Sequence, residues 1–144
     1  MPMEIKICGL KRVEDTLMVN KFEKIKYVGF VFANTSRKIT IEKALEIKKN
    51  LRPDIKTVGV FAGQPMEEII EIMEKADLDV CQLHSGETNE DCGLINKTVW
   101  KSISVKDKKS AEIAESYTNA DGFVLDTFKK NQWGGTGETF DWSA

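Results

Sequence analysis

The stretch ADGFVLDTFKKNQWGGTGETFDW, residues 120–142, holds the pattern on which the interpretation of the whole chain depends. It begins with the apolar run 122–125, which predicts a buried β-strand and stops at Asp126. A carboxylate at the end of a buried strand is costly unless it is paired or needed. The next loop contains Gly134-Gly135-Thr136-Gly137, whose backbone can approach a ligand closely, and Thr139 then begins a helical pattern. Two interpretations stay open for this stretch: part of an active site, or a surface aspartate followed by a flexible loop.

Outward from this stretch, the rest of the chain alternates between strand and helix patterns. The predicted strands cover residues 5–8, 27–32, 57–61, 78–83, 99–103 and 122–125. Between them, helical spacing of apolar residues covers residues 13–22, 41–51, 66–76 and 110–117, with a weak helical signal at 89–95. Short strands alternating with helices predict a parallel sheet, so we expect one α/β domain over residues 1–144.

The spacing of apolar residues also predicts which helix faces point inward. In the first helix we expect Val13, Leu17 and Met18 to face the core. Thr40 is the expected N-cap of the second helix. The inward residues expected in the second and third helices are Ile41, Ala44, Leu45, Ile47, Ile69, Ile70, Ile72 and Met73.

A parallel sheet of this kind is either an open doubly wound sheet or a (βα) barrel. The dinucleotide-binding version of the open sheet carries several glycines after its first strand, but Gly9 stands alone there. Polar residues end the first, fourth and sixth strands, whereas an open sheet gathers its functional residues at one switch point. The barrel is therefore favoured.

Composition limits the classes of partner. The net charge is −2 and the pI is about 5.6, which gives no reason to expect a nucleic-acid or membrane partner. Three cysteines without a CxxC motif argue against a disulfide framework. We therefore expect a cytoplasmic protein.

Cys8 and Asp126 are the candidate catalytic pair, because each ends a strand at the same rim of the sheet. A thiol and a carboxyl at one rim can serve as general base and general acid. A lone cysteine on a strand is, however, often a small buried apolar residue. Arg37 follows the second strand, where a guanidinium can clamp an anion or can simply be a solvated turn residue.

The fourth strand ends in Gln82-Leu83-His84, which places Gln82 and His84 on one face at the same rim. His84 is the only histidine in the chain and is expected to line a polar pocket. Cys81, His84 and Cys92 could suggest a metal site. Because Cys81 and His84 point to opposite faces of a strand, we expect no metal there.

Four motifs in this order carry a resemblance to a known family. They are Lys6-Ile7-Cys8-Gly9, Gly29-Phe30-Val31-Phe32 with Ser36-Arg37, Gln82-Leu83-His84, and Asp126-Thr127 with Gly134-Gly135-Thr136-Gly137 and Thr139-Phe140-Asp141-Trp142. Together they resemble the phosphoribosylanthranilate isomerases, (βα)8 TIM-barrel enzymes of tryptophan biosynthesis, over the whole chain. Each motif alone would be weak.

The resemblance implies an Amadori rearrangement of a small phosphosugar, the conversion of an aminoaldose to an aminoketose. It implies that Asp126 is the general acid and Cys8 the general base, and that no metal or organic cofactor takes part. It also implies that Arg37 contacts the anthranilate end of the substrate. The other implied substrate-binding residues are Gln82, His84, Gly135, Thr136 and Gly137.

Three departures from the family pattern affect these expectations. The Arg37 loop is one residue shorter than the usual Ser-x-Arg spacing, and Ser85 follows His84 where a glycine is common. About six βα units are present, whereas the family has eight, the last two of which hold the substrate phosphate. For the 144 residues alone we expect no activity and either homo-oligomers or association with a missing C-terminal segment.

Two other functions stay open from sequence. One is a barrel fragment without catalysis that acts as an assembly or binding module. The other is a different phosphosugar barrel enzyme, since a fold alone does not fix a function.

Overall fold

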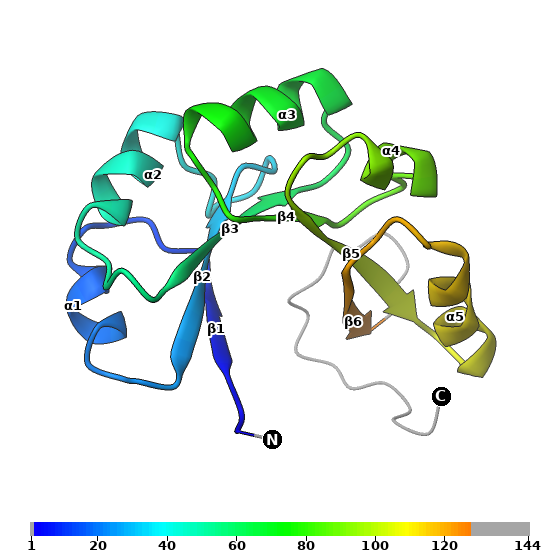
Figure 1. Cartoon of the computed structure of the whole chain (residues 1–144), viewed down its shortest axis with the longest axis horizontal. Helices are drawn as coiled ribbons and strands as arrows, with labels where there is room; N and C mark the ends of the chain where they lie inside the picture. Colours follow the sequence, from blue (N-terminus) through cyan, green and yellow to red (C-terminus); the bar gives the residue numbers. More distant parts are fainter. Residues whose placement is uncertain (1, 128–144) are drawn as a thin grey trace.

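The computed structural model describes residues 2–127, which form a six-stranded parallel sheet with helices on one side (Figure 1). The strands are β1 (Ile5–Cys8), β2 (Ile25–Val31), β3 (Lys56–Phe61), β4 (Val80–Leu83), β5 (Thr98–Val105) and β6 (Gly122–Thr127). Each strand pairs with the next in sequence, so the spatial order is β1-β2-β3-β4-β5-β6. This order has no switch point. The sheet curls as part of a barrel, which confirms the barrel over the doubly wound sheet.

The helices connect successive strands and cover the outer, convex face of the sheet (Figure 1). They are α1 (Asp15–Val19), α2 (Ile41–Lys48), α3 (Met66–Lys75), α4 (Asn89–Gly93), α5 (Lys108–Glu112) and the 3-10 turn η1 (Ile113–Ser116). The Thr40 hydroxyl accepts a hydrogen bond from the backbone N–H of Lys43, so the predicted cap of α2 is confirmed. No helix within residues 2–127 is long and apolar enough to cross a lipid bilayer.

The predicted inner face of the first helix is wrong in part. Leu17 and Met18 are 68% and 59% exposed, whereas Thr16 and Val19 are buried. Because α1 has only five residues, the pair spaced by three, Thr16 and Val19, defines its inner face. Thr16 can be buried there because its hydroxyl donates to the carbonyl of Val13 at 2.7 Å. Val13 packs against the core, as expected.

The inner faces of α2 and α3 agree better with the pattern. Ala44 and Ile47 of α2 are buried, and so are Ile69 and Met73 of α3. Ile41, Ile70 and Ile72 are partly buried and pack against the same core, and Leu45 is partly buried. These helices are longer, so apolar residues recur often enough at the helical period of 3.6 to identify the side of the helix that faces the core.

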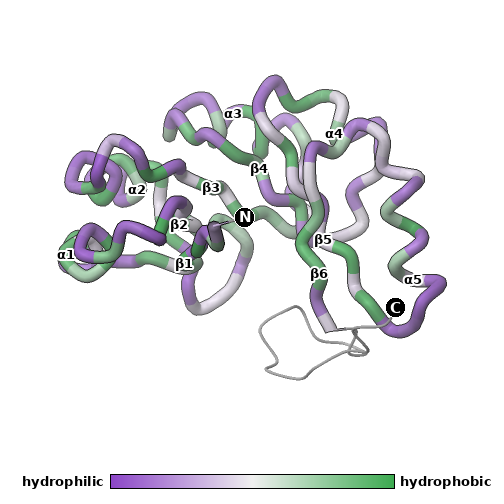
Figure 2. Tube along the Cα trace, turned by 60° about the horizontal axis from the view of Figure 1, so that its bottom comes forward, coloured by the Kyte–Doolittle hydropathy of each residue, from purple (hydrophilic) through white to green (hydrophobic). Residues whose placement is uncertain are grey.

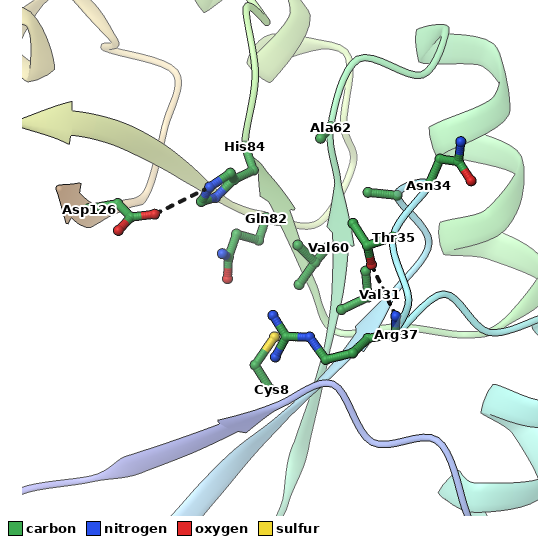
Figure 3. Close-up of a pocket in the computed structure, with 11 residues that line it drawn as sticks. Cys8, Val31, Asn34, Thr35, Arg37, Val60, Ala62, Gln82, His84 and Asp126 are labelled. Atoms are coloured by element: carbon green, nitrogen blue, oxygen red, sulfur yellow. Dashed lines mark hydrogen bonds and ion pairs between the residues drawn. The ribbon is translucent and has the colours of Figure 1, made fainter. Parts of the chain in front are cut away.

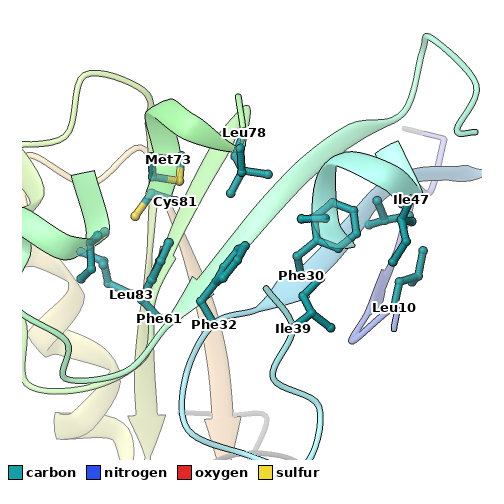
Figure 4. Packing of buried hydrophobic residues seen from close by; sticks show 14 of the residues in the cluster. Leu10, Phe30, Phe32, Ile39, Ile47, Phe61, Met73, Leu78, Cys81 and Leu83 are labelled. Carbon is teal, nitrogen blue, oxygen red and sulfur yellow. The ribbon is translucent and has the colours of Figure 1, made fainter. Parts of the chain in front are cut away.

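The core consists of two clusters because side chains of a strand alternate between the faces of the sheet. The larger cluster lies between the sheet and the helices and contains Phe32 stacked on Phe61, with ring centroids 5.5 Å apart (Figure 4). The smaller cluster lies on the inner face of the curl and consists of Val31, Ala33, Val58, Val60 and Val80. Apolar residues accordingly run along the strands, while loops and outer helix turns are hydrophilic (Figure 2). Cys8 and Trp100 pack against the smaller cluster, so the inner face leads directly to the rim that carries the polar residues.

Candidate active site

A pocket of about 410 Å³ opens at the carboxyl ends of the strands, on the inner face of the sheet (Figure 3). Its polar lining contains every predicted site residue that falls within residues 2–127. The lining residues are Cys8, Val31, Ala33, Asn34, Thr35, Arg37, Val60, Ala62, Gln82, His84 and Asp126. The predicted substrate-binding residues Gly135, Thr136 and Gly137 lie outside the described residues.

Cys8 and Asp126 lie on opposite sides of this pocket, because they stand at the carboxyl ends of β1 and β6, the two edge strands of the sheet within residues 2–127 (Figure 3). A ligand in the pocket therefore has a thiol on one side and a carboxyl on the other. This is the arrangement that a reaction with two proton transfers at different atoms requires.

Two glycines make room for the functional side chains around Cys8. Gly29 is the register partner of Cys8 on β2, and a Cβ at Gly29 would lie 2.7 Å from the Cys8 sulfur. Gly9 has a φ of +88°, and a Cβ there would lie 2.8 Å from Cδ of Arg37. The glycines in the Lys6-Ile7-Cys8-Gly9 and Gly29-Phe30-Val31-Phe32 motifs thus serve packing at the pocket.

Within residues 2–127, Asp126 lies beside the backbone of Thr127 and the ring of His84. Its Oδ1 accepts the backbone N–H of Thr127 at 2.8 Å, and its Oδ2 lies 3.5 Å from Nε2 of His84. The other ring nitrogen of His84, Nδ1, is 2.7 Å from the Ser102 hydroxyl. Burial lowers the pKa of His84, and the nearby Asp126 only partly opposes this effect. A ring between a hydroxyl and a carboxyl can give or take a hydrogen bond at Nε2, because the hydroxyl can do either at Nδ1.

Arg37 lies in the turn between β2 and α2. Its backbone N–H donates to the Thr35 hydroxyl at 3.2 Å, and the turn closes where the N–H of Ile39 donates to the carbonyl of Val31. The side chain passes over Gly9, and its guanidinium points toward the Cys8 side of the pocket (Figure 3). Arg37 is exposed, so it can reach an anionic ligand at the mouth of the pocket.

Gln82 and Lys6 meet across the inside of the curl. The side-chain carbonyl of Gln82 accepts a hydrogen bond from the Lys6 ammonium, although their strands β4 and β1 are not neighbours in the sheet. Cys8 lies on the same face of β1 as Lys6, and its thiol acts to raise the pKa of Lys6 against the larger, lowering effect of burial. The alternation of side chains shows that Lys6 and Cys8 share a face, but sequence reasoning gave Lys6 no role.

A buried ion pair secures the loop that follows β4. Glu87 and Lys101 are both nearly fully buried, and Lys101 Nζ lies 3.7 Å from Glu87 Oε1. Glu87 accepts the backbone N–H groups of Ser85 at 2.7 Å and Gly63 at 3.0 Å, and Lys101 donates to the carbonyl of Ser85 at 2.6 Å. These bonds fix the chain just beyond His84. No sequence motif pointed to this pair, because its members lie in different loops and strands.

The thiols other than Cys8 lie away from the pocket. Cys81 and Cys92 are both in the core cluster between the sheet and the helices, whereas His84 lines the pocket on the other face. The expected separation of Cys81 from His84 is confirmed, and burial raises the pKa of Cys81 to about 12. Within residues 2–127, no group of three or more histidine, cysteine, aspartate or glutamate side chains is arranged to hold a metal ion.

The chain is similar to known proteins over nearly its whole length. A protein from Thermoanaerobacter sp. (strain X514), named N-(5'-phosphoribosyl)anthranilate isomerase, is 45% identical over 141 residues, which are 97% of this chain and 68% of that protein. The crystal structure of phosphoribosyl anthranilate isomerase from Thermotoga maritima superposes with a TM-score of 0.87 at 35% identity, covering 98% of this chain and 69% of that one.

A further phosphoribosyl anthranilate isomerase was solved in complex with reduced 1-(o-carboxyphenylamino)-1-deoxyribulose 5-phosphate. It superposes with a TM-score of 0.80 at 33% identity, covering 88% of this chain and 66% of that one. The family model described as N-(5'phosphoribosyl)anthranilate (PRA) isomerase matches residues 5–144. The chain therefore belongs to the N-(5'-phosphoribosyl)anthranilate isomerase family.

Proposed function

We propose that the protein carrying this chain converts N-(5'-phosphoribosyl)anthranilate to 1-(2-carboxyphenylamino)-1-deoxyribulose 5-phosphate, an aldose–ketose isomerisation in tryptophan biosynthesis. Within this proposal Cys8 is the general base and Asp126 the general acid. The observation that carries it is the placement of this thiol and this carboxyl on opposite sides of one pocket, in a chain of the isomerase family. A pocket lined in this way also argues against a non-catalytic assembly module.

The acid step opens the sugar ring. Asp126 donates its proton to the ring oxygen of the ribose, the bond from C1' to that oxygen breaks, and the nitrogen lone pair forms the Schiff base. Asp126 is then a carboxylate. The N–H of Thr127 donates a hydrogen bond to that charge, and Nε2 of His84 lies 3.5 Å from it.

The base step makes the ketose. The Cys8 thiolate takes the proton from C2'. The electrons of that C–H bond form the C1'–C2' double bond of an enolamine, while the second pair of the C1'–N double bond returns to nitrogen. The enolamine then becomes the ketone when C1' gains a proton and the hydroxyl at C2' loses one. The enzyme is left with a thiol at Cys8 and a carboxylate at Asp126, so one proton returns from the first to the second through solvent before the next turnover.

The direct test is turnover by the purified protein that carries this chain. We expect the anthranilate aminoaldose to disappear and the aminoketose phosphate to appear in equal amounts, as measured by chromatography and mass spectrometry. No metal should be needed, so turnover should persist in excess chelator. A protein that binds the reduced product analogue but never forms the ketose would contradict the proposed activity.

Arg37 is proposed to hold the anionic anthranilate end of the substrate. A charge-assisted hydrogen bond contributes about 1.5–3 kcal/mol, so Arg37→Ala should weaken affinity for the reduced product analogue roughly ten- to a hundredfold. KM should rise more than kcat falls, because the contact is made in the ground state as well. Lys38→Ala, in the same turn, is the matched control and should bind as the parent does. Equal affinity of the parent and Arg37→Ala would show that Arg37 is only a solvated turn residue.

A further inference from the structure

Lys6 is a partly buried lysine beside the thiol that the proposed function uses as base. It lies two residues before Cys8 on β1, so both side chains point into the curl of the sheet. Its ammonium donates to the side-chain carbonyl of Gln82, and the nearby Cys8 thiol favours the charged form of Lys6. The proposed mechanism assigns no role to the Lys6 ammonium group.

The surroundings of Lys6 show what keeps a charge there. Burial lowers the pKa of Lys6, Cys8 opposes this shift by favouring the ammonium, and the Arg37 guanidinium adds to it by repulsion. His84 also interacts electrostatically with Lys6. Among the described residues that line the pocket, His84 and Asp126 are the titratable groups besides Cys8 and Arg37. Tyr27, the register neighbour of Lys6 on β2, contacts Trp100, with ring centroids 5.0 Å apart. Among the groups that influence Lys6, Cys8 is the one whose negative charge favours the ammonium, and it shares the inner face of β1 with Lys6.

The hydrogen bond to Gln82 orients the Lys6 ammonium. Gln82 is only 4% exposed, and its carbonyl oxygen is occupied by Lys6. An amide oxygen is a neutral acceptor, so it orients the ammonium without neutralising it. The positive charge therefore remains available to a second neighbour, which is Cys8.

We propose that Lys6 is a positioning residue that stabilises the Cys8 thiolate, with Gln82 holding the Lys6 ammonium in place. The proposal rests on the proposed function for the role of Cys8 as base. A free thiol titrates near ~8.5 and is mostly protonated at neutral pH. At rest the thiol proton passes to solvent and the negative sulfur faces the ammonium; in turnover the sulfur takes the C2' proton.

Arg37 is a second cation among the described residues, and its charged end points toward Cys8 (Figure 3). It is exposed, so water screens its charge, whereas Lys6 lies inside the curl, where the effective dielectric constant is lower. Arg37 also has a ligand to hold at the pocket mouth. Lys6 and Arg37 therefore have different roles: Lys6 stabilises the sulfur of Cys8, and Arg37 faces the substrate.

The experiment measures the rate of Cys8 alkylation by iodoacetamide as a function of pH, because only the thiolate reacts. Mass spectrometry of the Cys8 peptide measures alkylation of Cys8 separately from any alkylation of the buried thiols Cys81 and Cys92. In Lys6→Met the midpoint of the alkylation profile should rise by about 1–3 pH units, the effect of removing an opposite charge from beside a titrating group. Lys6→Gln also removes the charge and should show the same rise, so the result does not depend on the folding of one variant.

Two further variants complete the comparison. Lys6→Arg keeps a cation and should keep a midpoint close to that of the parent. Lys26→Met removes a strand lysine whose ammonium pairs with Asp54 at 2.9 Å, away from the pocket, and should leave the profile unchanged. An unchanged profile in both Lys6→Met and Lys6→Gln would overturn the proposal, as would an equal rise in Lys26→Met. A Lys6-dependent profile in a protein that does not turn over the anthranilate substrate would support the pairing and refute the proposed function instead.

Discussion

Cys8→Ala should lower kcat about 10²–10⁴-fold, the range that a general base contributes, while affinity for the reduced product analogue stays near that of the parent. Alanine removes only the sulfur, and the backbone hydrogen bonds that hold β1 against β2 remain. The lost interaction is the transfer of the C2' proton, which occurs only in the transition state. Single-turnover kinetics on the variant, with analogue binding by calorimetry, measure the two quantities separately.

Cys92→Ala is the control for this experiment. Cys92 is a buried thiol in the core cluster and does not line the pocket. Its removal should cost some stability through a small cavity and should leave kcat unchanged at a temperature where the variant is folded. Turnover by Cys8→Ala at the rate of Cys92→Ala would rule out Cys8 as the base.

Asp126→Asn should also lower kcat about 10²–10⁴-fold, because asparagine has no proton to give to the ring oxygen. The change is nearly isosteric. An asparagine oxygen can still accept the N–H of Thr127, which now lies 2.8 Å from Oδ1, and it can keep its place opposite His84. The fold of the pocket is therefore retained, and steady-state kinetics should report the loss of the acid itself.

Asp121→Asn is the matched control at the other end of β6. The Asp121 carboxylate accepts the backbone N–H of Val99 at 2.8 Å, a contact that an amide oxygen can also make, and it lies outside the pocket. This variant should turn over substrate like the parent. If Asp126→Asn and Asp121→Asn have the same rate, the proton donor is another group.

The two edges of the sheet show where prediction from sequence succeeded and where it fell short. The predicted strands at 5–8 and 122–125 correspond to β1 and β6, and the candidate pair near their ends lines one pocket. The expected burial of 122–125 is wrong, because β6 is an edge strand of the described sheet and Phe123 and Leu125 are 42% and 47% exposed. The prediction of which residues of the first helix face the core was partly wrong. A helix of five residues contains too few helical repeats to identify its inner side from the spacing of apolar residues. The glycine-rich loop of residues 134–137 lies outside the described residues, so its role stays a prediction.

The sequence by itself determined the alternation of strands and helices and the residues that end each strand at the rim. The physical reason is local: side chains alternate along a strand, and parallel strands all end at one edge of the sheet. These two rules placed Cys8, Gln82, His84 and Asp126 together without any knowledge of distances.

Only the tertiary structure decided which of these groups touch. The contact of Lys6 with Gln82 joins β1 to β4, and that of His84 with Asp126 spans β5. Neither pair lies on neighbouring strands, so each depends on how strongly the sheet curls and on the register of every strand between them. The buried pair of Glu87 and Lys101 has the same origin, because two charges can leave water only where the folded backbone supplies their remaining hydrogen bonds.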